Sequence, residues 1–196
     1  MRIFLLARHG ESLFNVGGLV NGDPARDRGL SEIGQAEART LGDQISGVGI
    51  DLAVTSEFPR ARETASIALA GRSVPHVVIA DLNDIRIGEL EGKTIADYRT
   101  WKRAHVRSDP FPGGESLDDA ASRYARAYRA VLARPERIVL VVCHEIPVRY
   151  AVNAAAGSPQ LDAPAHDIRN AVPYIFGERQ LETAVAGLER LAVTTA

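Results

Sequence analysis

The chain has 196 residues, of which 45% are hydrophobic and 24% are charged. This length fits one domain of generous size, and this composition is typical of a globular protein, which excludes a disordered, low-complexity or fibrous chain. The 23 basic and 25 acidic residues leave a formal net charge of -2, so the chain has no overall cationic field for binding nucleic acid. Any anion that binds must therefore be held by a local group of charges.

The apolar segments are too short for a membrane span. The longest runs, Ile3–Ala7 and Ile138–Cys143, fall far short of the ~18 residues that cross a bilayer, and Arg8 closes the first run before it reaches the length of a signal-peptide core. Cys143 is the only cysteine, which excludes an intramolecular disulfide and a thiolate zinc cluster. These features predict a soluble, cytoplasmic protein without a membrane partner.

Strand-like and helix-like segments alternate along the chain. Four apolar runs are typical of strands buried on both faces of a parallel sheet, and a last pair of strands is predicted near the C-terminus. The strands are expected at Met1–Ala7, Asp51–Thr55, His76–Ala80, Ile138–Val142, Val172–Phe176 and Leu181–Val185. Helices are expected after Ser31, with Ile33, Leu41 and Ile45 on one stripe, over Pro59–Ala70, and over Leu117–Arg134 with a cap formed by Ser116 and Asp119.

This alternation predicts an α/β fold, a three-layer α/β/α sandwich with a mostly parallel central sheet. We expect a single domain over residues 1–196. Its most loop-like stretch, Arg103–Gly114, belongs to a short cap or lid over residues 93–113, because long interior loops are often functional.

Charged and imidazole side chains follow three of the predicted strands. Arg8 and His9 end the first strand, Arg60 stands at the start of the helix after the second, and His144 follows the fourth. Ligands gather at the carboxyl ends of parallel strands, and a helix N-terminus favours anions. Alone, Arg8-His9-Gly10 is also compatible with a solvated charge beside a structural histidine, but together these residues indicate a phosphate site.

The order and spacing of these motifs resemble the histidine phosphatase superfamily, which includes cofactor-dependent phosphoglycerate mutase and broad-specificity acid-type phosphatases. The resemblance covers most of the chain and rests on Arg8–Ser12, Asn15, Leu30–Ala36, Arg60-Ala61 with Thr64-Ala65, Gly88 with Glu91-Gly92, Gly114–Ser116 and His144. It implies that His9 attacks phosphorus and forms a phosphohistidine. It also implies that Arg8 and Arg60 bind the phosphoryl oxygens and lower the pKa of His9, with His144 and Asn15 as further phosphate ligands.

The resemblance places the proton donor just after the third strand. Asp84 stands there, where most members have glutamate, and would act as general acid toward the leaving oxygen and then as general base toward water. Its shorter side chain leaves open the alternative of a loop residue that caps a turn. Glu11 and Glu91 are rivals that we expect to orient arginine or backbone groups.

Two further positions depart from the family pattern. Glu145 follows the second histidine where many relatives have glycine, and Phe14 stands where mutases usually carry tryptophan. We group Glu145 with the substrate-binding candidates Arg8, Asn15, Arg60 and His144. Because an inward carboxylate would repel phosphate, we expect it to point away and to stabilise a helix start. Arg149 receives no catalytic role.

No metal or other cofactor is expected, because His76, His105 and His166 show no metal-ligand spacing. The segment over residues 93–113 is shorter than the cover that mutases of the family carry, which favours hydrolysis by water. Its aromatic and cationic residues are compatible with substrate binding or with an ordinary amphipathic helix; they are Tyr98, Trp101, Lys102, Arg103, His105 and Arg107.

The sequence therefore predicts a metal-independent phosphomonoesterase acting on a small-molecule phosphate ester, as a monomer or homodimer. Two alternatives remain open. One is an isomerase of the phosphoglycerate mutase type, and the other is a phosphate-binding regulatory module in which Asp84 and Glu145 have weakened catalysis.

Overall fold

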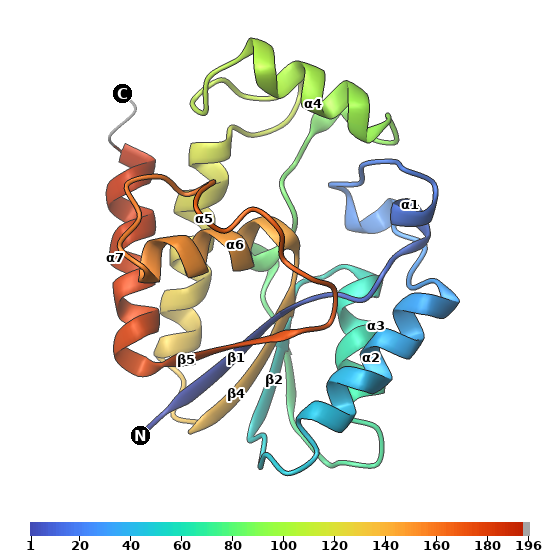
Figure 1. The fold of residues 1–196 in the computed structure, drawn as a ribbon, viewed down its shortest axis with the longest axis vertical. Helices are drawn as coiled ribbons and strands as arrows, with labels where there is room; N and C mark the ends of the chain where they lie inside the picture. Colours follow the sequence, from blue (N-terminus) through green and yellow to red (C-terminus); the bar gives the residue numbers. More distant parts are fainter. Residues whose placement is uncertain (194–196) are drawn as a thin grey trace.

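The computed structural model describes residues 1–193, which form a five-stranded sheet covered by helices on both faces (Figure 1). The strand order is β3-β2-β4-β1-β5. β5 is antiparallel to β1, and the other strands are parallel. The strands are β1 (Ile3–Arg8), β2 (Leu52–Thr55), β3 (His76–Val78), β4 (Ile138–Cys143) and β5 (Pro173–Gly177). The predicted α/β sandwich with a mostly parallel sheet is confirmed.

The helices divide between the two faces of the sheet (Figure 1). One face is covered by α2 (Glu32–Gln44) and α3 (Pro59–Ala68), and the other by α5 (Leu117–Leu132), α6 (Glu145–Ala155) and α7 (Glu178–Val193). Successive side chains of a strand point to opposite faces, so Leu5 packs toward α2 and α3 while Phe4 and Leu6 pack toward α5, α6 and α7. Both faces of β1 are buried, which explains its continuous apolar sequence.

Shorter elements surround the carboxyl edge of the sheet. α1 (Leu13–Val16) follows β1, and α4 (Ile95–Ala104) lies across the top of the edge in Figure 1. Single 3₁₀ turns occupy Pro24–Arg26, Ala80–Leu82 and Gly88–Leu90. The loop after β1 packs so closely on α2 that a Cβ on Gly10 would lie 2.4 Å from the Gly34 carbonyl oxygen. Glycine is therefore required directly after His9.

Helix starts agree with the predicted caps. The side chain of Ser31 accepts a hydrogen bond from the Gly34 amide, and Ser116 forms a capping box with Asp119. Such caps satisfy amides that the first helical turn leaves unpaired. The helices predicted over Pro59–Ala70 and Leu117–Arg134 correspond to α3 and α5, and each ends two residues earlier than predicted.

Three expectations about elements are wrong. β3 is an edge strand whose His76 and Val78 are exposed, because it pairs only with β2 in the described sheet. Leu181–Val185 belongs to α7, where Leu181, Ala184 and Val185 are buried at helical spacing. Ile33 is 61% exposed, whereas Leu41 and Ile45 are buried. Short apolar runs carry too little periodicity to separate a strand from a buried helix face.

No helix within residues 1–193 is long and apolar enough to cross a membrane.

Candidate active site

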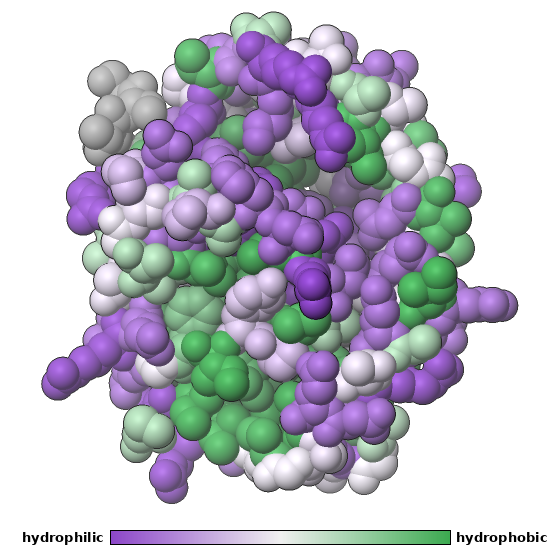
Figure 2. Space-filling model, viewed as in Figure 1, coloured by the Kyte–Doolittle hydropathy of each residue, from purple (hydrophilic) through white to green (hydrophobic). Residues whose placement is uncertain are grey.

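A pocket of about 480 Å³ opens at the carboxyl edge of the sheet, beneath α4. The hollow is visible below α4 in Figure 2. Its floor is formed by residues at the end of β1 and in the first turns of α3 and α6, and its roof by α4. All catalytic candidates except His144 line it, and His144 lies directly behind it in contact with Arg60.

His9 follows β1 and is 3% exposed. Its Nδ1 lies 2.7 Å from the Gly10 carbonyl oxygen, and its Nε2 lies 3.0 Å from the Nε of Arg60. Because a carbonyl accepts and a guanidinium donates, the proton is on Nδ1 and the lone pair is on Nε2. Burial, together with Arg60 and Arg8, holds the pKa of His9 well below its usual value. The imidazole is therefore neutral, and its nucleophilic lone pair lies on Nε2, which accepts a hydrogen bond from Arg60.

Arg60 lies at the centre of the site and is 3% exposed. Besides His9, its guanidinium contacts the Asn21 side-chain oxygen at 2.6 Å, Asp27 at 3.2 Å and Asp84 at 3.3 Å. Asp27 also accepts from the Arg60 backbone amide at 2.8 Å. These contacts fix the planar guanidinium in one orientation, as recognition of a phosphoryl group requires.

His144 follows β4 and is fully buried. Its Nδ1 accepts from Arg60 Nη2 at 3.2 Å, so its Nε2 carries the proton and donates to the Ser56 hydroxyl at 2.9 Å. Burial and Arg60 hold the pKa of His144 well below its usual value. The rings of His9 and His144 lie 5.3 Å apart, because β1 and β4 are paired neighbours.

Asp84 contributes a carboxylate on the opposite side of Arg60. Its Oδ1 accepts from the Ile85 amide at 3.0 Å, and its Oδ2 lies 3.3 Å from Arg60 Nη2 and 3.6 Å from His144 Nδ1. The side chain is 22% exposed, so one edge faces the pocket. Burial raises the pKa of Asp84 despite the neighbouring Arg60, which favours a carboxyl group that can hold a proton.

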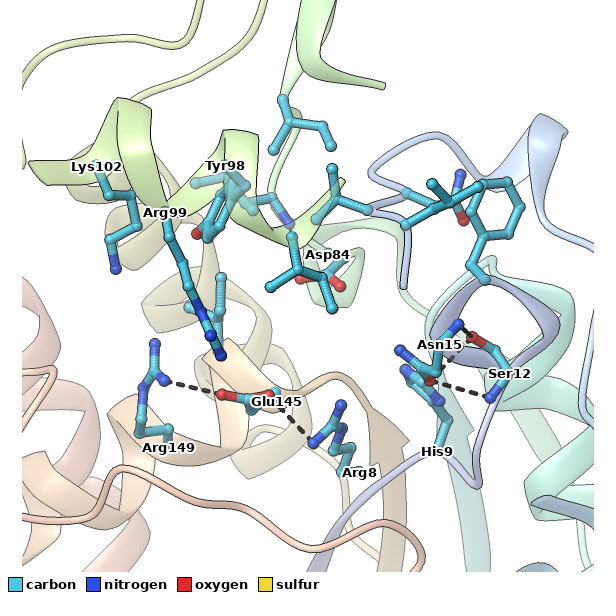
Figure 3. A pocket seen from close by; sticks show the side chains of 18 of the residues that line it. Arg8, His9, Ser12, Asn15, Asp84, Tyr98, Arg99, Lys102, Glu145 and Arg149 are labelled. Atoms are coloured by element: carbon cyan, nitrogen blue, oxygen red, sulfur yellow. Dashed lines mark hydrogen bonds and ion pairs between the residues drawn. The ribbon is translucent and has the colours of Figure 1, made fainter. Parts of the chain in front are cut away.

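The sequence predicts that Glu145 points away from the pocket, and this prediction is wrong. It lines the cavity between Arg8 and Arg149 (Figure 3). Its Oε2 lies 3.1 Å from Arg8 Nη1, and its Oε1 lies 2.9 Å from Arg149 Nη1. Two guanidinium groups hold the carboxylate in this position and offset its charge.

The other predicted carboxylates have supporting positions. Glu91 accepts from the Asn21 side chain at 2.6 Å and from the Gly22 amide at 2.7 Å. Asn21 in turn holds Arg60, so Glu91 orients an arginine indirectly, as predicted. Glu11 accepts from the Ser31 hydroxyl at 2.7 Å.

Asn15 lines the pocket close to His9 (Figure 3). Its side-chain oxygen accepts from the backbone amide of Ser12 at 3.0 Å and from the Ser12 hydroxyl at 2.9 Å. Since the oxygen is engaged, the amide nitrogen is the group that can donate to a ligand.

Sequence reasoning missed Asn21, Ser56 and Arg149 as residues of the site. None of them lies in a motif that signals its role. Asn21 and Ser56 act through partners far away in the chain, whereas Arg149 pairs with Glu145 one helical turn earlier. The cover is a helix from which Tyr98, Lys102 and Arg103 line the pocket. Trp101 instead stacks on His105 with ring centroids 4.0 Å apart, and Arg107 pairs with Asp118 at 3.0 Å.

Within the described residues, no three His, Cys, Asp or Glu side chains are placed together to hold a metal ion.

Comparisons with known proteins agree with this geometry. The family profile of the histidine phosphatase superfamily (branch 1) matches residues 4–188. A curated 2,3-bisphosphoglycerate-dependent phosphoglycerate mutase of Methylobacterium sp. (strain 4-46) is 34% identical over 192 residues, which cover 89% of this chain and 90% of that protein.

Solved structures with a similar fold agree with this family. The fold is similar to that of Bacillus stearothermophilus YhfR, with a TM-score of 0.78 and 28% identity, covering 88% of this chain and 89% of that one. It is also similar to the alpha-ribazole phosphatase from Shigella flexneri, with a TM-score of 0.70 and 28% identity, covering 80% and 81% of the two chains.

Proposed function

Because the chain belongs to the histidine phosphatase superfamily, an enzyme superfamily, we propose that it is a histidine acid-type phosphatase, which hydrolyses a small-molecule phosphate monoester through a phosphohistidine on His9. The observation that carries this proposal is the neutral, buried His9 whose Nε2 lies 3.0 Å from Arg60, with Asp84 3.3 Å from the same guanidinium.

In the first step, Nε2 of His9 attacks phosphorus while the bond to the leaving oxygen breaks. Arg8, Arg60 and the Asn15 amide bind the phosphoryl oxygens, which spreads the charge of a transition state that needs positioning more than covalent help. The carbonyl of Gly10 holds the imidazole proton on Nδ1. Asp84 gives its proton to the leaving oxygen, so that an alcohol departs.

In the second step, water attacks the phosphohistidine. Asp84, now a carboxylate, takes a proton from the water, and inorganic phosphate leaves as His9 regains its lone pair. The exposed edge of Asp84 supports this role, because solvent reaches that side of the carboxyl group. His144 stays neutral and contributes through its contacts with Arg60 and Ser56.

The isomerase alternative is favoured by one observation, the mutase name of a relative that is 34% identical. The match spans 192 aligned positions but 89% of this chain's 196 residues, about 174, so the mutase has about 18 residues more within the aligned region. This difference is compatible with the shorter cover predicted over residues 93–113, which favours hydrolysis by water. The phosphatase is supported by the solvent-exposed edges of Asp84 and Glu145 and by the likeness to a phosphatase at 28% identity.

The test follows both products from 3-phosphoglycerate, with and without added 2,3-bisphosphoglycerate. We expect release of inorganic phosphate to exceed formation of 2-phosphoglycerate under both conditions, and p-nitrophenyl phosphate to be hydrolysed. Rapid interconversion of the phosphoglycerates with little phosphate released would establish the mutase instead. Failure to turn over any phosphate ester would favour the binding module.

A further inference from the structure

Glu145 places a carboxylate in the floor of the pocket, beside the phosphate ligand Arg8. The side chain is 34% exposed, whereas Arg8 and Arg149 on its two sides are 16% and 12% exposed. Figure 3 shows Glu145 between these two arginines and open toward the cavity. It is therefore within reach of whatever part of the substrate extends from the phosphate toward α6.

The charges on this floor are already paired. Glu145 binds both arginines, and the second arm of Arg149 lies 3.1 Å from Asp162. A carboxylate or phosphate on the leaving group would have to compete with Glu145 for the same guanidinium groups and would lie close to a like charge. Such an arrangement disfavours a second anionic group at this place.

Glu145 also retains acceptor capacity. Each carboxylate oxygen can accept two hydrogen bonds. Arg149 donates one to Oε1, and Oε2 forms an ion pair with Arg8. The exposed edge can accept from hydroxyl groups in the pocket. A site that accepts from a substrate hydroxyl discriminates strongly against an analogue that lacks the donor.

The cations of the cover add positive charge above this floor. Arg103 on α4 is exposed, so salt screens its charge, whereas Arg99 points from α4 toward Glu145 (Figure 3) and is a further guanidinium for which an anionic group would have to compete with Glu145. Lys102 lies 3.9 Å from Asp162. The outer pocket attracts anions from solution in general, but the floor next to the ester determines which leaving group fits.

We propose that Glu145 determines substrate specificity by accepting hydroxyl groups of the leaving group and excluding a second anionic group, so that the substrates are phosphate monoesters of neutral, hydroxyl-bearing alcohols. This inference rests on the proposed phosphatase function. It concerns the leaving group and not the chemistry at phosphorus.

Glycerol 3-phosphate and 3-phosphoglycerate are suitable probes, because they differ in a hydroxymethyl group against a carboxylate. The wild-type enzyme is expected to consume glycerol 3-phosphate with a kcat/KM about tenfold higher or more, and the preference is expected to narrow as salt is raised. Glu145→Gln should move this ratio about tenfold toward 3-phosphoglycerate, mainly through KM, because it removes the repelling charge and frees two arginines. Glu145→Asp should keep the wild-type preference.

Glu182→Gln is the matched control, since it removes one carboxylate from the exposed face of α7 and should leave the ratio unchanged. A wild-type enzyme that prefers 3-phosphoglycerate, or a Glu145→Gln variant with an unaltered ratio, would overturn the inference. The wild-type comparison keeps the test valid if that variant does not fold. Hydrolysis of p-nitrophenyl phosphate distinguishes the two failures: activity on it with an unaltered ratio refutes the role of Glu145 alone, and no activity refutes the phosphatase.

Discussion

Replacing Asp84 by asparagine tests the proton transfer at the centre of the mechanism. Asparagine has nearly the same shape, and its side-chain oxygen can still accept from the Ile85 amide, as Asp84 does at 3.0 Å. It cannot protonate a leaving oxygen. It also loses the charged acceptor that lies 3.3 Å from Arg60, so two separate effects are expected.

The two effects have different sizes and different substrate dependence. Loss of the charged contact to Arg60 acts on every substrate, and a hydrogen bond to a charged group is worth roughly 1.5–3 kcal/mol, or about 10- to 100-fold in rate. Loss of the general acid costs an additional ~10²–10⁴-fold, but only where the leaving oxygen needs a proton. An alkyl phosphate needs it and p-nitrophenyl phosphate does not, so the ratio of their losses measures the proton transfer alone.

The assay compares kcat for glycerol 3-phosphate and p-nitrophenyl phosphate in wild type and Asp84→Asn over a range of pH. We expect the alkyl ester to lose at least about 100-fold more than the aryl ester. Because burial raises the pKa of Asp84, the wild-type rate on the alkyl ester should fall as pH rises through that raised pKa, and this decline should vanish in the variant. Equal losses on both esters would refute the reasoning and reduce Asp84 to a positioning residue. A larger selective loss in Glu11 or Glu91 variants would transfer the role.

Three further outcomes are expected. His9→Ala should lose at least about 1,000-fold in rate, and quenched wild-type reactions should contain an acid-labile phosphohistidine; near-normal turnover would exclude His9 as the nucleophile. Enzyme treated with a chelator should keep its rate, because arginines and histidines supply the positive charge, whereas loss that added metal restores would indicate a metallophosphatase. His9 is neutral in the folded state and binds a proton on unfolding below its ordinary pKa of about 6.5, so its stabilising contribution is present above that pH and is lost as pH falls. In urea unfolding, the decrease in stability between pH 7.5 and 5.5 should therefore be smaller in His9→Ala than in wild type.

The sequence was sufficient where local signals and strand topology act together. Apolar runs of strand length alternating with capped helices specified an α/β sandwich, because buried parallel strands need apolar residues on both faces. Parallel strands also end at a common edge, so Arg8 and His9 after one strand and His144 after another had to meet. That inference needed no knowledge of packing.

The sequence did not predict correctly those features that depend on tertiary packing. Leu181–Val185 has the composition of a strand and lies in α7, because burial against α5 and α6 outweighs the local preference of five residues. Ile33 is apolar but exposed, since the axis of α2 relative to the sheet selects which stripe is covered. Whether a strand lies at the edge or in the centre of the sheet likewise depends on which strands pair, and β3 is exposed because it pairs only with β2 in the described sheet.

The orientation of polar side chains in the site was decided only by the tertiary structure. Asn21 and Ser56 became parts of the site because a loop and a strand end converge on Arg60 and His144. Glu145 turned toward the pocket because Arg8, 137 positions earlier in the numbering, and Arg149, one helical turn later, both pair with it. A charge is repelled or held according to its neighbours in space, and these neighbours exist only once β1 and β4 lie side by side.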